Sequence, residues 1–239
     1  MSERSGGPRH HRGRLSRERV LAAALALVDR EGLSALSMRR LAAELGVEAM
    51  ALYRYTPGKD ALLDGLVEAF HRELQEALEE ERPEVAERGP GNVAAAGWRS
   101  DLHRTARETY RVSLRHPQVV PLLATRMLAV PLSRLPPSVL RTQERMLALL
   151  ARAGLDDHRT QLLYRAVTAW VLGYAFVELR TVVNNPNEPE PAIRLGLHRM
   201  PAQEFPLLRA TAPALAERAG EQALTDGLDA LLDGFAAGT

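Results

Sequence analysis

The stretch Ser37-Met38-Arg39-Arg40-Leu41-Ala42-Ala43-Glu44-Leu45-Gly46-Val47-Glu48-Ala49-Met50-Ala51-Leu52-Tyr53-Arg54-Tyr55 decides the fold. Apolar residues recur at helical spacing on both sides of Gly46, which predicts two short helices joined by a tight glycine turn. Helices this short are not stable alone, so neighbouring helices must hold the second one and present it to an external partner. The pattern therefore predicts a helix-turn-helix motif whose second helix enters the major groove of double-stranded DNA.

Composition defines the broad class of protein. The chain has 239 residues, 46% of them hydrophobic, which is ordinary for a globular protein with a real core. It has no cysteine, which excludes disulfides, thiolate zinc sites and cysteine nucleophiles. The first residues are polar and arginine-rich, unlike a secretory signal, and the longest uncharged run (166–177) is shorter than the roughly 20 residues that span a bilayer. We expect a soluble, cytoplasmic protein without a membrane partner.

Charge is unevenly distributed along the chain. Residues 1–60 contain eleven Lys or Arg and seven Asp or Glu, whereas the rest of the chain contains twenty and twenty-three. A basic N-terminal module on a mildly acidic body suits a protein that binds DNA at one end. Residues 1–14 are predicted to be a disordered basic arm. Two interpretations of this arm stay open: it is simply solvated, or its arginines add phosphate or minor-groove contacts.

Helical patterns dominate the remaining chain, and no segment alternates convincingly with the period of a strand. Ser16 and Ser37 are predicted N-caps of the first two helices. Later helices are expected over 59–82, 98–116, 118–130, 136–153, 157–183 and 221–237, with loops at 83–92 and 184–191. Segment 192–213 is ambiguous between helix and a mobile region. We predict an all-α fold, in which an N-terminal three-helix helix-turn-helix DNA-binding domain (15–60) is linked by a long helix to a larger helical bundle (61–239).

Nine residues of the motif and its flanks are the predicted DNA contacts: Arg39, Glu48, Ala49, Met50, Ala51, Tyr53, Arg54, Tyr55 and Lys59. The small apolar residues of the second helix suit thymine methyl groups and a close approach of the backbone. Arg39 is suited to bidentate contact with guanine, and the two tyrosines can donate hydrogen bonds to phosphates. Lys59, at the start of the next helix, lies where backbone amides also favour an anion. The alternative interpretation is a helical hairpin that does not bind DNA.

A longer pattern includes this motif: Arg17-Glu18-x-Val20 … Ala23-Ala24-Leu25 … Gly32 … Ser37-Met38-Arg39-x-Leu41-Ala42-x-x-Leu45-Gly46-Val47 … Leu52-Tyr53-x-Tyr55 … Lys59-x-x-Leu62-Leu63. With it the chain resembles the TetR family of bacterial transcriptional regulators over about fifty-five residues. Trp98, Ala124-Thr125-Arg126 and Glu221-Gln222-Ala223-Leu224-x-x-Gly227-Leu228-x-x-Leu231-Leu232-x-Gly234-Phe235 resemble, more loosely, the body of the tetracycline-repressor subgroup. The resemblance implies a helical ligand-binding and dimerisation domain and a homodimer on a palindromic operator. A ligand would move the long fourth helix, spread the two recognition helices and release the DNA.

The resemblance also implies where a ligand binds. In the tetracycline repressors a pocket histidine ligates a magnesium ion carried by the drug, and the aligned residue here is Leu122, which cannot bind a metal. We therefore expect no metal site and no cofactor. The predicted ligand-binding positions are Gln75, Thr105, Thr109, Leu122, Thr125, Trp170 and Tyr174. The alternatives are that the inward threonines are core residues bonded to their own helix, and that the aromatic pair belongs to the core or to a dimer interface.

The leading functional hypothesis is a repressor that a small-molecule effector releases from its operator. An effector-independent or activating regulator is the alternative, and a helical enzyme with a DNA-binding head is less favoured. We find no nucleophile elbow, phosphate-binding loop or convincing pair of carboxylates, so we predict no catalytic residues and no enzyme activity. The two long apolar helices, 158–183 and 221–237, are the predicted dimer surface, with the core of the single chain as the alternative.

Overall fold

The computed structural model describes residues 15–80, 93–184, 196, 199, 201 and 203–237, and within them it is helical with no strand. The head consists of α1 (Arg17–Glu31), η1 (Leu33–Ala35), α2 (Met38–Leu45), α3 (Ala49–Leu52) and the start of α4 (Lys59–Glu80). The body consists of α5 (Val93–Arg115), α6 (Val120–Ala129), η2 (Leu132–Arg134), α7 (Pro137–Ala151), α8 (Asp157–Asn184), α10 (Pro206–Ala216) and α11 (Gly220–Ala237). The predicted all-α fold is confirmed. The predicted basic arm, the loop at 83–92 and residues 185–191 lie outside the described residues.

The turn of the predicted helix-turn-helix forms as its residue types dictate. The Ser16 hydroxyl accepts a hydrogen bond from the Arg19 amide at 3.2 Å, and the Ser37 hydroxyl accepts one from the Arg40 amide at 3.1 Å. Each serine thereby satisfies an amide in the first turn of its helix. Gly46 ends α2 in the left-handed conformation (φ 65°), which glycine adopts without the steric cost that a Cβ brings.

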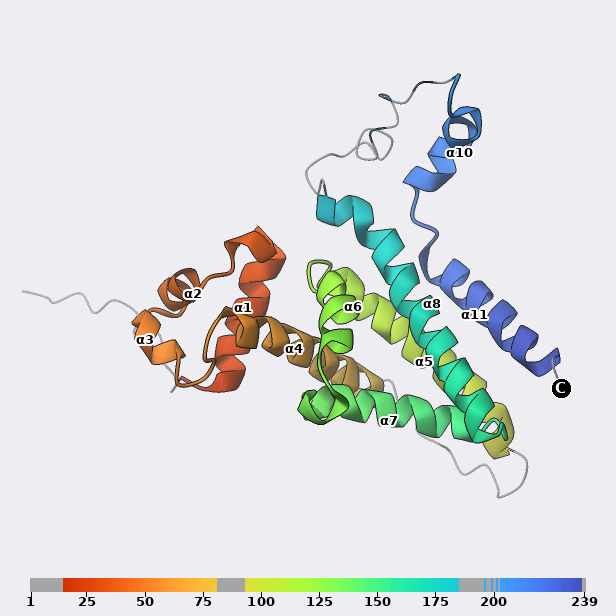
Figure 1. The fold of residues 1–239 in the computed structure, drawn as a ribbon, viewed down its shortest axis with the longest axis horizontal. Coiled ribbons are helices and arrows are strands. Elements are labelled where there is room, and N and C mark those ends of the chain that lie inside the picture. Colours follow the sequence, from red (N-terminus) through yellow and green to blue (C-terminus); the bar gives the residue numbers. More distant parts are fainter. Residues whose placement is uncertain are drawn as a thin grey trace, which may run out of the picture.

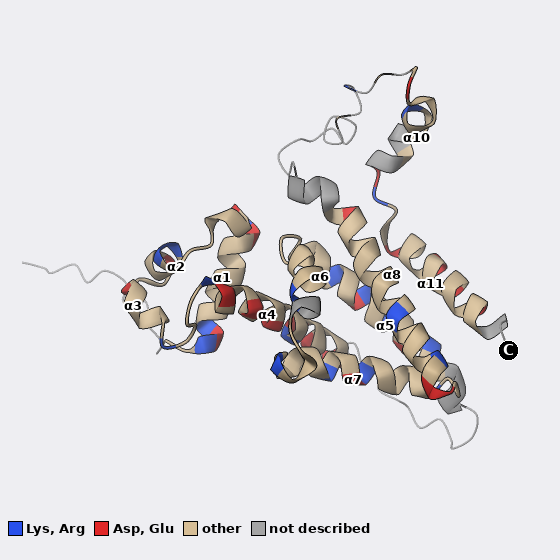
Figure 2. Ribbon diagram, in the orientation of Figure 1, with Lys and Arg blue, Asp and Glu red and all other residues tan. Residues whose placement is uncertain are grey.

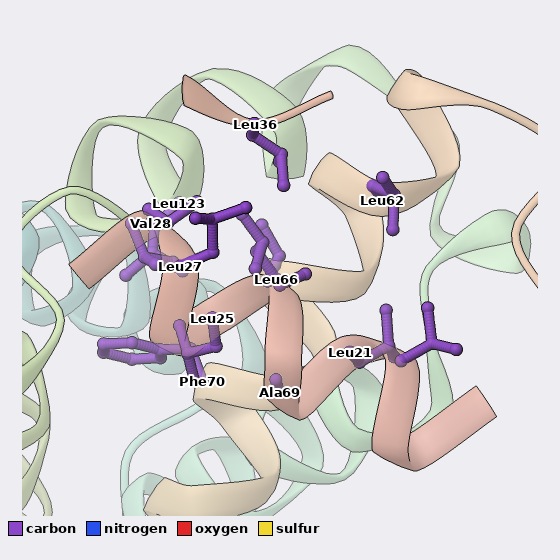
Figure 3. Packing of buried hydrophobic residues seen from close by; sticks show 14 of the residues in the cluster. Leu21, Leu25, Leu27, Val28, Leu36, Leu62, Leu66, Ala69, Phe70 and Leu123 are labelled. Atoms are coloured by element: carbon purple, nitrogen blue, oxygen red, sulfur yellow. The ribbon is translucent and has the colours of Figure 1, made fainter. Parts of the chain in front are cut away.

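One buried cluster joins the head to α4. In Figure 3, side chains of α1, such as Leu21 and Leu27, face Leu62, Leu66 and Phe70 of α4, and all five are fully buried. Leu123 of α6 and Val112 of α5 belong to the same cluster, so the apolar core continues from the head into the body. The first half of α4 is therefore part of the head's own core, and a domain boundary at residue 60 stays a prediction.

A second core lies between α5, α8 and α11. It contains Leu102, Val167, Val171, Leu224 and Leu228, among others. In Figure 1, α8 and α11 run side by side at the far end of the molecule from the head. The apolar stripe of α11 is thus used inside the single chain, which is one of the two roles that the sequence left open for it.

The opposite face of α8 is exposed, with polar residues such as Arg165 in its first half and apolar ones from Ala169 to Val177. Leu162, Phe176 and Val177 expose 44%, 48% and 66% of their surface, and Ala169 and Gly173 lie exposed between them. Among the described residues, the segment Asp157–Leu179 is long and apolar enough to cross a membrane by length and composition. Of its most apolar window, 28% is buried in the chain. The uncharged run 166–177 is therefore shorter than the apolar part of this helix, because a few isolated charged residues do not stop a longer segment from being apolar on average.

Part of the segment that the sequence left ambiguous is helical. Residues Pro206–Ala216 form α10, which projects from the rest of the body in Figure 1. Pro206 stands at its first position, where a missing amide hydrogen costs nothing. Pro213 lies inside the same helix, and an interior proline removes a backbone hydrogen bond, which obscured the helical pattern in the sequence.

Gly65 permits the close approach of α1 and α4. A Cβ at this position would overlap a terminal methyl group of Leu21, which is completely buried. We expect Gly65→Ala to lower the free energy of unfolding by about 1–3 kcal/mol, the usual cost of overpacking. Urea unfolding at a fixed protein concentration, followed by circular dichroism, measures this change.

Gly97→Ala is the matched control, because a Cβ at Gly97 of α5 meets no atom of the described residues within 4 Å. This substitution should leave stability unchanged or raise it by up to about 1 kcal/mol through helix propensity. Equal effects of the two substitutions would contradict the proposed tight contact between α1 and α4.

Candidate DNA-binding surface and ligand cavity

The short helix α3 presents its predicted contact residues to solvent. Met50 exposes 76% of its surface and Tyr53 46%, and Glu48 and Arg54 are also exposed. Leu52, on the opposite side of α3, is completely buried and anchors the helix in the head core. Ala49 and Tyr55 are half-buried and pack against the same core, and Ala51 is half-buried too. The structure thus exposes a narrow surface formed by Glu48, Met50, Tyr53 and Arg54, which suits entry into a groove.

The two consecutive arginines of α2 differ in their partners. Arg40 forms an ion pair with Glu31 at 2.8 Å, and Arg30 bridges Glu31 and Glu44 at 3.0 Å each. Hydrogen bonds from Arg40 and Arg30 lower the pKa of Glu31, so this network stays charged near neutral pH. Arg39 is exposed, and the described part of the chain offers it no ion pair. Of the two guanidinium groups, Arg39 is therefore the one that can bind DNA without breaking an internal contact.

The N-terminal turns of α4 are tied to the body. Lys59 is exposed at the first position of α4, directly after the head. Next to it, Asp60 forms an ion pair with Arg126 of α6 at 2.7 Å, and Asp64 forms one with the same guanidinium at 2.6 Å. Figure 2 shows the contrast between basic residues on α2 and acidic residues along α4. A movement of α6 would therefore act on α4 close to the predicted DNA contacts.

His116, just after α5, forms a second joint between head and body. Its Nδ1 lies 2.7 Å from Asp29 of α1, and its Nε2 lies 2.7 Å from Glu73 of α4. Both carboxylates can accept hydrogen bonds only when both ring nitrogens carry protons. Burial alone lowers the pKa of His116, but the two carboxylates outweigh this effect and raise it above 6.5. Burial in turn raises the pKa of Glu73, but His116 and Arg115 together lower it.

The body contains a mainly apolar cavity between α4, α5, α6, α7 and α8. Its free volume is about 70 Å³, and the wider space around it, part of it open to solvent, is about 540 Å³. It is lined by Phe70, His71, Leu74, Thr105, Thr109, Leu123, Thr142, Gln143, Met146, Tyr164, Val167, Thr168, Val171 and Leu172. This arrangement can bind a small, largely apolar molecule with a few directed hydrogen bonds.

Two of the seven predicted ligand positions line this cavity. Thr105 and Thr109 do so, although their hydroxyls donate to carbonyls of their own helix, at 2.8 Å each. Gln75 lies behind the lining, where its amide donates to the Ser138 carbonyl at 2.7 Å and to Thr142 at 3.4 Å. Leu122 and Thr125 of α6 are not among the lining residues, and Thr125 is exposed.

Trp170 and Tyr174 face α11 and not the cavity. The Trp170 indole donates to the Leu224 carbonyl at 3.0 Å, and the Tyr174 hydroxyl donates to the Gly220 carbonyl at 2.6 Å. A Cβ at Gly227 would overlap the indole, so the ring lies directly on the α11 backbone. The geometry gives this pair a packing role between α8 and α11, the alternative that the sequence had left open.

The sequence analysis missed His71. The imidazole is 6% exposed and lines the cavity, and its Nδ1 lies 3.3 Å from the Thr142 hydroxyl. Burial lowers the pKa of His71 to about 4, so the ring is neutral at physiological pH. The signal was its spacing, because Val67, His71, Leu74 and Leu78 follow the helical period along one face of α4.

The cavity has no group of side chains suited to binding a metal ion among the described residues. Within the residues that the structure describes, no three His, Cys, Asp or Glu side chains gather closely enough to hold an ion.

The raised pKa of His116 gives a pH-dependent contribution to stability. A group whose pKa is raised in the folded state stabilises fully below its unfolded value of 6.5, and this stabilisation is lost as the pH rises through the folded value. We expect the difference in unfolding free energy between the wild type and His116→Gln to be largest near about pH 5.5 and to shrink toward about pH 8.5. Urea unfolding across this range measures it.

His158→Gln is the control for this prediction, since His158 is exposed at the start of α8. The His116→Gln difference should vary with pH more than the His158→Gln difference does. A His116→Gln difference that does not vary with pH would contradict the charged bridge.

Comparison with known proteins places the chain in a family. The family model described as bacterial regulatory proteins of the tetR family matches residues 20–66, and the tetracyclin repressor-like C-terminal domain matches residues 91–238. The HTH-type transcriptional repressor DrrR1 of Streptomyces coeruleorubidus is 35% identical over 165 residues, which are 69% of this chain and 54% of that relative, so the match spans about half its length. An HTH-type transcriptional regulator of Saccharopolyspora erythraea is 31% identical over 201 residues, 84% of this chain and 76% of that protein.

A solved structure agrees with these matches over nearly the whole fold. The Streptomyces coelicolor TetR family protein ActR, in complex with actinorhodin, has a TM-score of 0.67 and 28% sequence identity, covering 95% of this chain and 99% of that one. The resemblance predicted from the head and from both ends of the body is confirmed. The chain belongs to the TetR family of bacterial regulatory proteins.

Proposed function

We propose that this chain is a transcriptional repressor that binds a palindromic operator as a homodimer and is released by a small-molecule effector. The observation that carries this proposal is the double role of α4. Phe70 lines the cavity and also belongs to the buried cluster that includes Leu25 and Val28 of α1. A molecule in the cavity therefore touches the same helix that completes the core of the head.

Two polar joints supply further coupling between cavity and head. Leu123 of α6 lines the cavity, and Arg126, three residues later on the same helix, holds Asp60 and Asp64 at the start of α4. His116 links α5 to α1 and α4. A shift of α5 or α6 around a bound molecule would tilt α4 and, with it, the head. Two heads that must match half-sites about one helical turn apart tolerate little tilt.

The relatives support both halves of the proposal. DrrR1 is named a transcriptional repressor, and ActR is described in complex with actinorhodin, a small molecule. By analogy, the cavity of this chain binds an effector of its own, whose identity is a separate question. The same analogy favours a cytoplasmic regulator with no catalytic activity.

The exposed face of α8 supports the homodimer. Phe176 and Val177, with Ala169 and Gly173, form a stripe at helical spacing that the single chain leaves uncovered. A large exposed apolar patch on a soluble protein usually marks an interface. A two-fold axis beside α8 would pair this stripe with its copy and set the distance between the two heads.

The direct test is a titration onto labelled DNA from the region flanking the chain's own gene, followed by fluorescence anisotropy at two salt concentrations. We expect tighter binding to this DNA than to a scrambled duplex, with two protomers per site. Equal and steeply salt-dependent binding to both duplexes would contradict a specific operator in that region. Specific binding that no compound in an effector screen weakens would favour the effector-independent alternative.

Substitution of Arg39 tests the DNA-binding surface. We expect Arg39→Ala to weaken specific binding by roughly 1–3 kcal/mol, the range for loss of one good base contact, with a smaller loss on scrambled DNA. Arg40→Ala is the matched control, because Arg40 is also exposed but engaged with Glu31. If Arg39→Ala weakens binding to specific and scrambled DNA equally, Arg39 contacts phosphate and not a base. If Arg39→Ala and Arg40→Ala weaken specific binding equally, the proposal that only Arg39 is free to bind DNA is wrong.

A further inference from the structure

The cavity is uncharged at neutral pH. None of the described residues that line it is Asp, Glu, Lys or Arg. Burial raises the pKa of Tyr164 above its usual value of 10.0, which keeps its phenol protonated. Burial also keeps His71 neutral, with a pKa of about 4. A charged molecule would enter this site without a counter-charge, which is strongly unfavourable in an apolar environment.

The hydrogen bonds around Thr142 favour one tautomer of His71. The Thr142 hydroxyl lies closer to the Ser138 carbonyl, at 3.0 Å, than to His71 Nδ1, at 3.3 Å, and donates to that carbonyl. Its oxygen then accepts from other neighbours, so His71 Nδ1 carries the proton and donates it to Thr142. In a neutral imidazole the other nitrogen is then an acceptor. His71 Nε2 thus has a lone pair and no proton.

That lone pair has no partner inside the chain. His71 Nε2 is completely buried and is the one buried side-chain nitrogen or oxygen without a hydrogen bond among the described residues. The residue itself is 6% exposed and lines the cavity. A buried acceptor without a donor destabilises the unliganded protein, and a bound molecule that supplies a donor recovers the lost interaction.

Two of the cavity threonines, Thr105 and Thr109, add acceptors and not donors. The Thr105 hydroxyl donates to the Asp101 carbonyl and the Thr109 hydroxyl to the Thr105 carbonyl, so both oxygens are left only with lone pairs. Gln143, Tyr164 and Thr168 carry donor groups, so an acceptor elsewhere on a bound molecule would also find partners. At His71 Nε2 itself, however, a bound oxygen or nitrogen without a proton would face a lone pair.

We propose that the effector is an uncharged, mainly apolar molecule that donates a hydrogen bond, from a hydroxyl or N–H group, to His71 Nε2. This inference rests on the proposed function, because it assumes that the cavity is the effector site. It excludes carboxylates and charged metal chelates as effectors, since both bring charge into a neutral cavity.

Three probes of similar size separate these possibilities. 2-Naphthol has a hydroxyl donor, 2-methoxynaphthalene keeps the oxygen but loses the proton, and 2-naphthoate is an anion. Isothermal titration of the full-length wild type at pH 7 should give 2-naphthol about tenfold tighter binding than the ether, the factor for one hydrogen bond of ordinary net strength. The anion should bind weakest.

Two variants assign the effect to His71. His71→Phe keeps a ring but removes the acceptor, so the preference for 2-naphthol should disappear. His158→Phe, the same substitution at an exposed histidine, should retain it. A measurement on the wild type makes the test independent of the folding of His71→Phe: nitrogen-15 spectra should show His71 protonated at Nδ1, with an Nε2 signal that shifts on addition of 2-naphthol.

The outcomes separate this inference from the proposed function. A preference for the ether or the anion, a preference for 2-naphthol that survives in His71→Phe, or a proton on Nε2 would overturn the inference. Failure of all three probes to bind, in a protein that still binds its operator, would also overturn it and leave the repressor function standing. If 2-naphthol binds tightest and the anion weakest, but the protein binds no operator, the inferred hydrogen bond to His71 would stand and the repressor function would be overturned.

Discussion

The burial of one face of α4 against α1 holds the head and the body together, and the size of this contact limits how the molecule can move. Leu62, Leu66 and Phe70 are completely buried in the shared cluster. Burial of such a side chain contributes about 2 kcal/mol, so exposure of all three would cost about 6 kcal/mol. Coupling free energies between binding sites are typically about 1–3 kcal/mol. An effector can therefore tilt α4 and the head as one body, but it cannot separate them.

The polar joints have the opposite character. Arg126 with Asp60 and Asp64, and His116 with Asp29 and Glu73, are partly exposed ion pairs. Exposed ion pairs contribute about 0–1 kcal/mol each, which is well within the free energy that one ligand can redistribute. These contacts can break and re-form while the apolar cluster stays intact. The rigid apolar contact and the exchangeable polar contacts together favour a head that moves as a lever on the body.

The sequence predicts those features of the structure that are determined by residues close together in the chain. The caps at Ser16 and Ser37, the turn at Gly46 and the helical periods are set within a few residues, and the structure confirms them. The cavity is not local, because α4, α5, α7 and α8 contribute His71, Thr105, Thr142 and Tyr164 from distant parts of the chain. Their meeting depends on how the helices pack, which a helical period does not specify.

The aromatic pair of α8 shows the same limit from the other side. Trp170 and Tyr174 are predicted ligand residues because they share a helix face, and the structure does place both side chains on one face of α8. The partner of that face is decided by α11, where Gly227 leaves room for the indole and the Leu224 carbonyl accepts its proton. The tryptophan packs on α11 because Gly227, fifty-seven positions later in the chain, has no side chain in its way. This role becomes visible only once α8 and α11 are seen to pack together.

The outer face of α8 has to be reconciled with its ability, by length, to cross a membrane. A helix in lipid is apolar on every side and keeps its ionisable groups toward a protein interior or water. One face of α8 already packs against the body, and Glu178 near its end accepts hydrogen bonds from Tyr110 and from the amides of Ala219 and Gly220 at the start of α11. What remains is a narrow stripe that includes the small residues Ala169 and Gly173, where another helix can approach closely. A stripe of this width fits the same helix of a second copy better than it fits a bilayer, so the property that makes α8 resemble a membrane span is the one that the proposed homodimer requires.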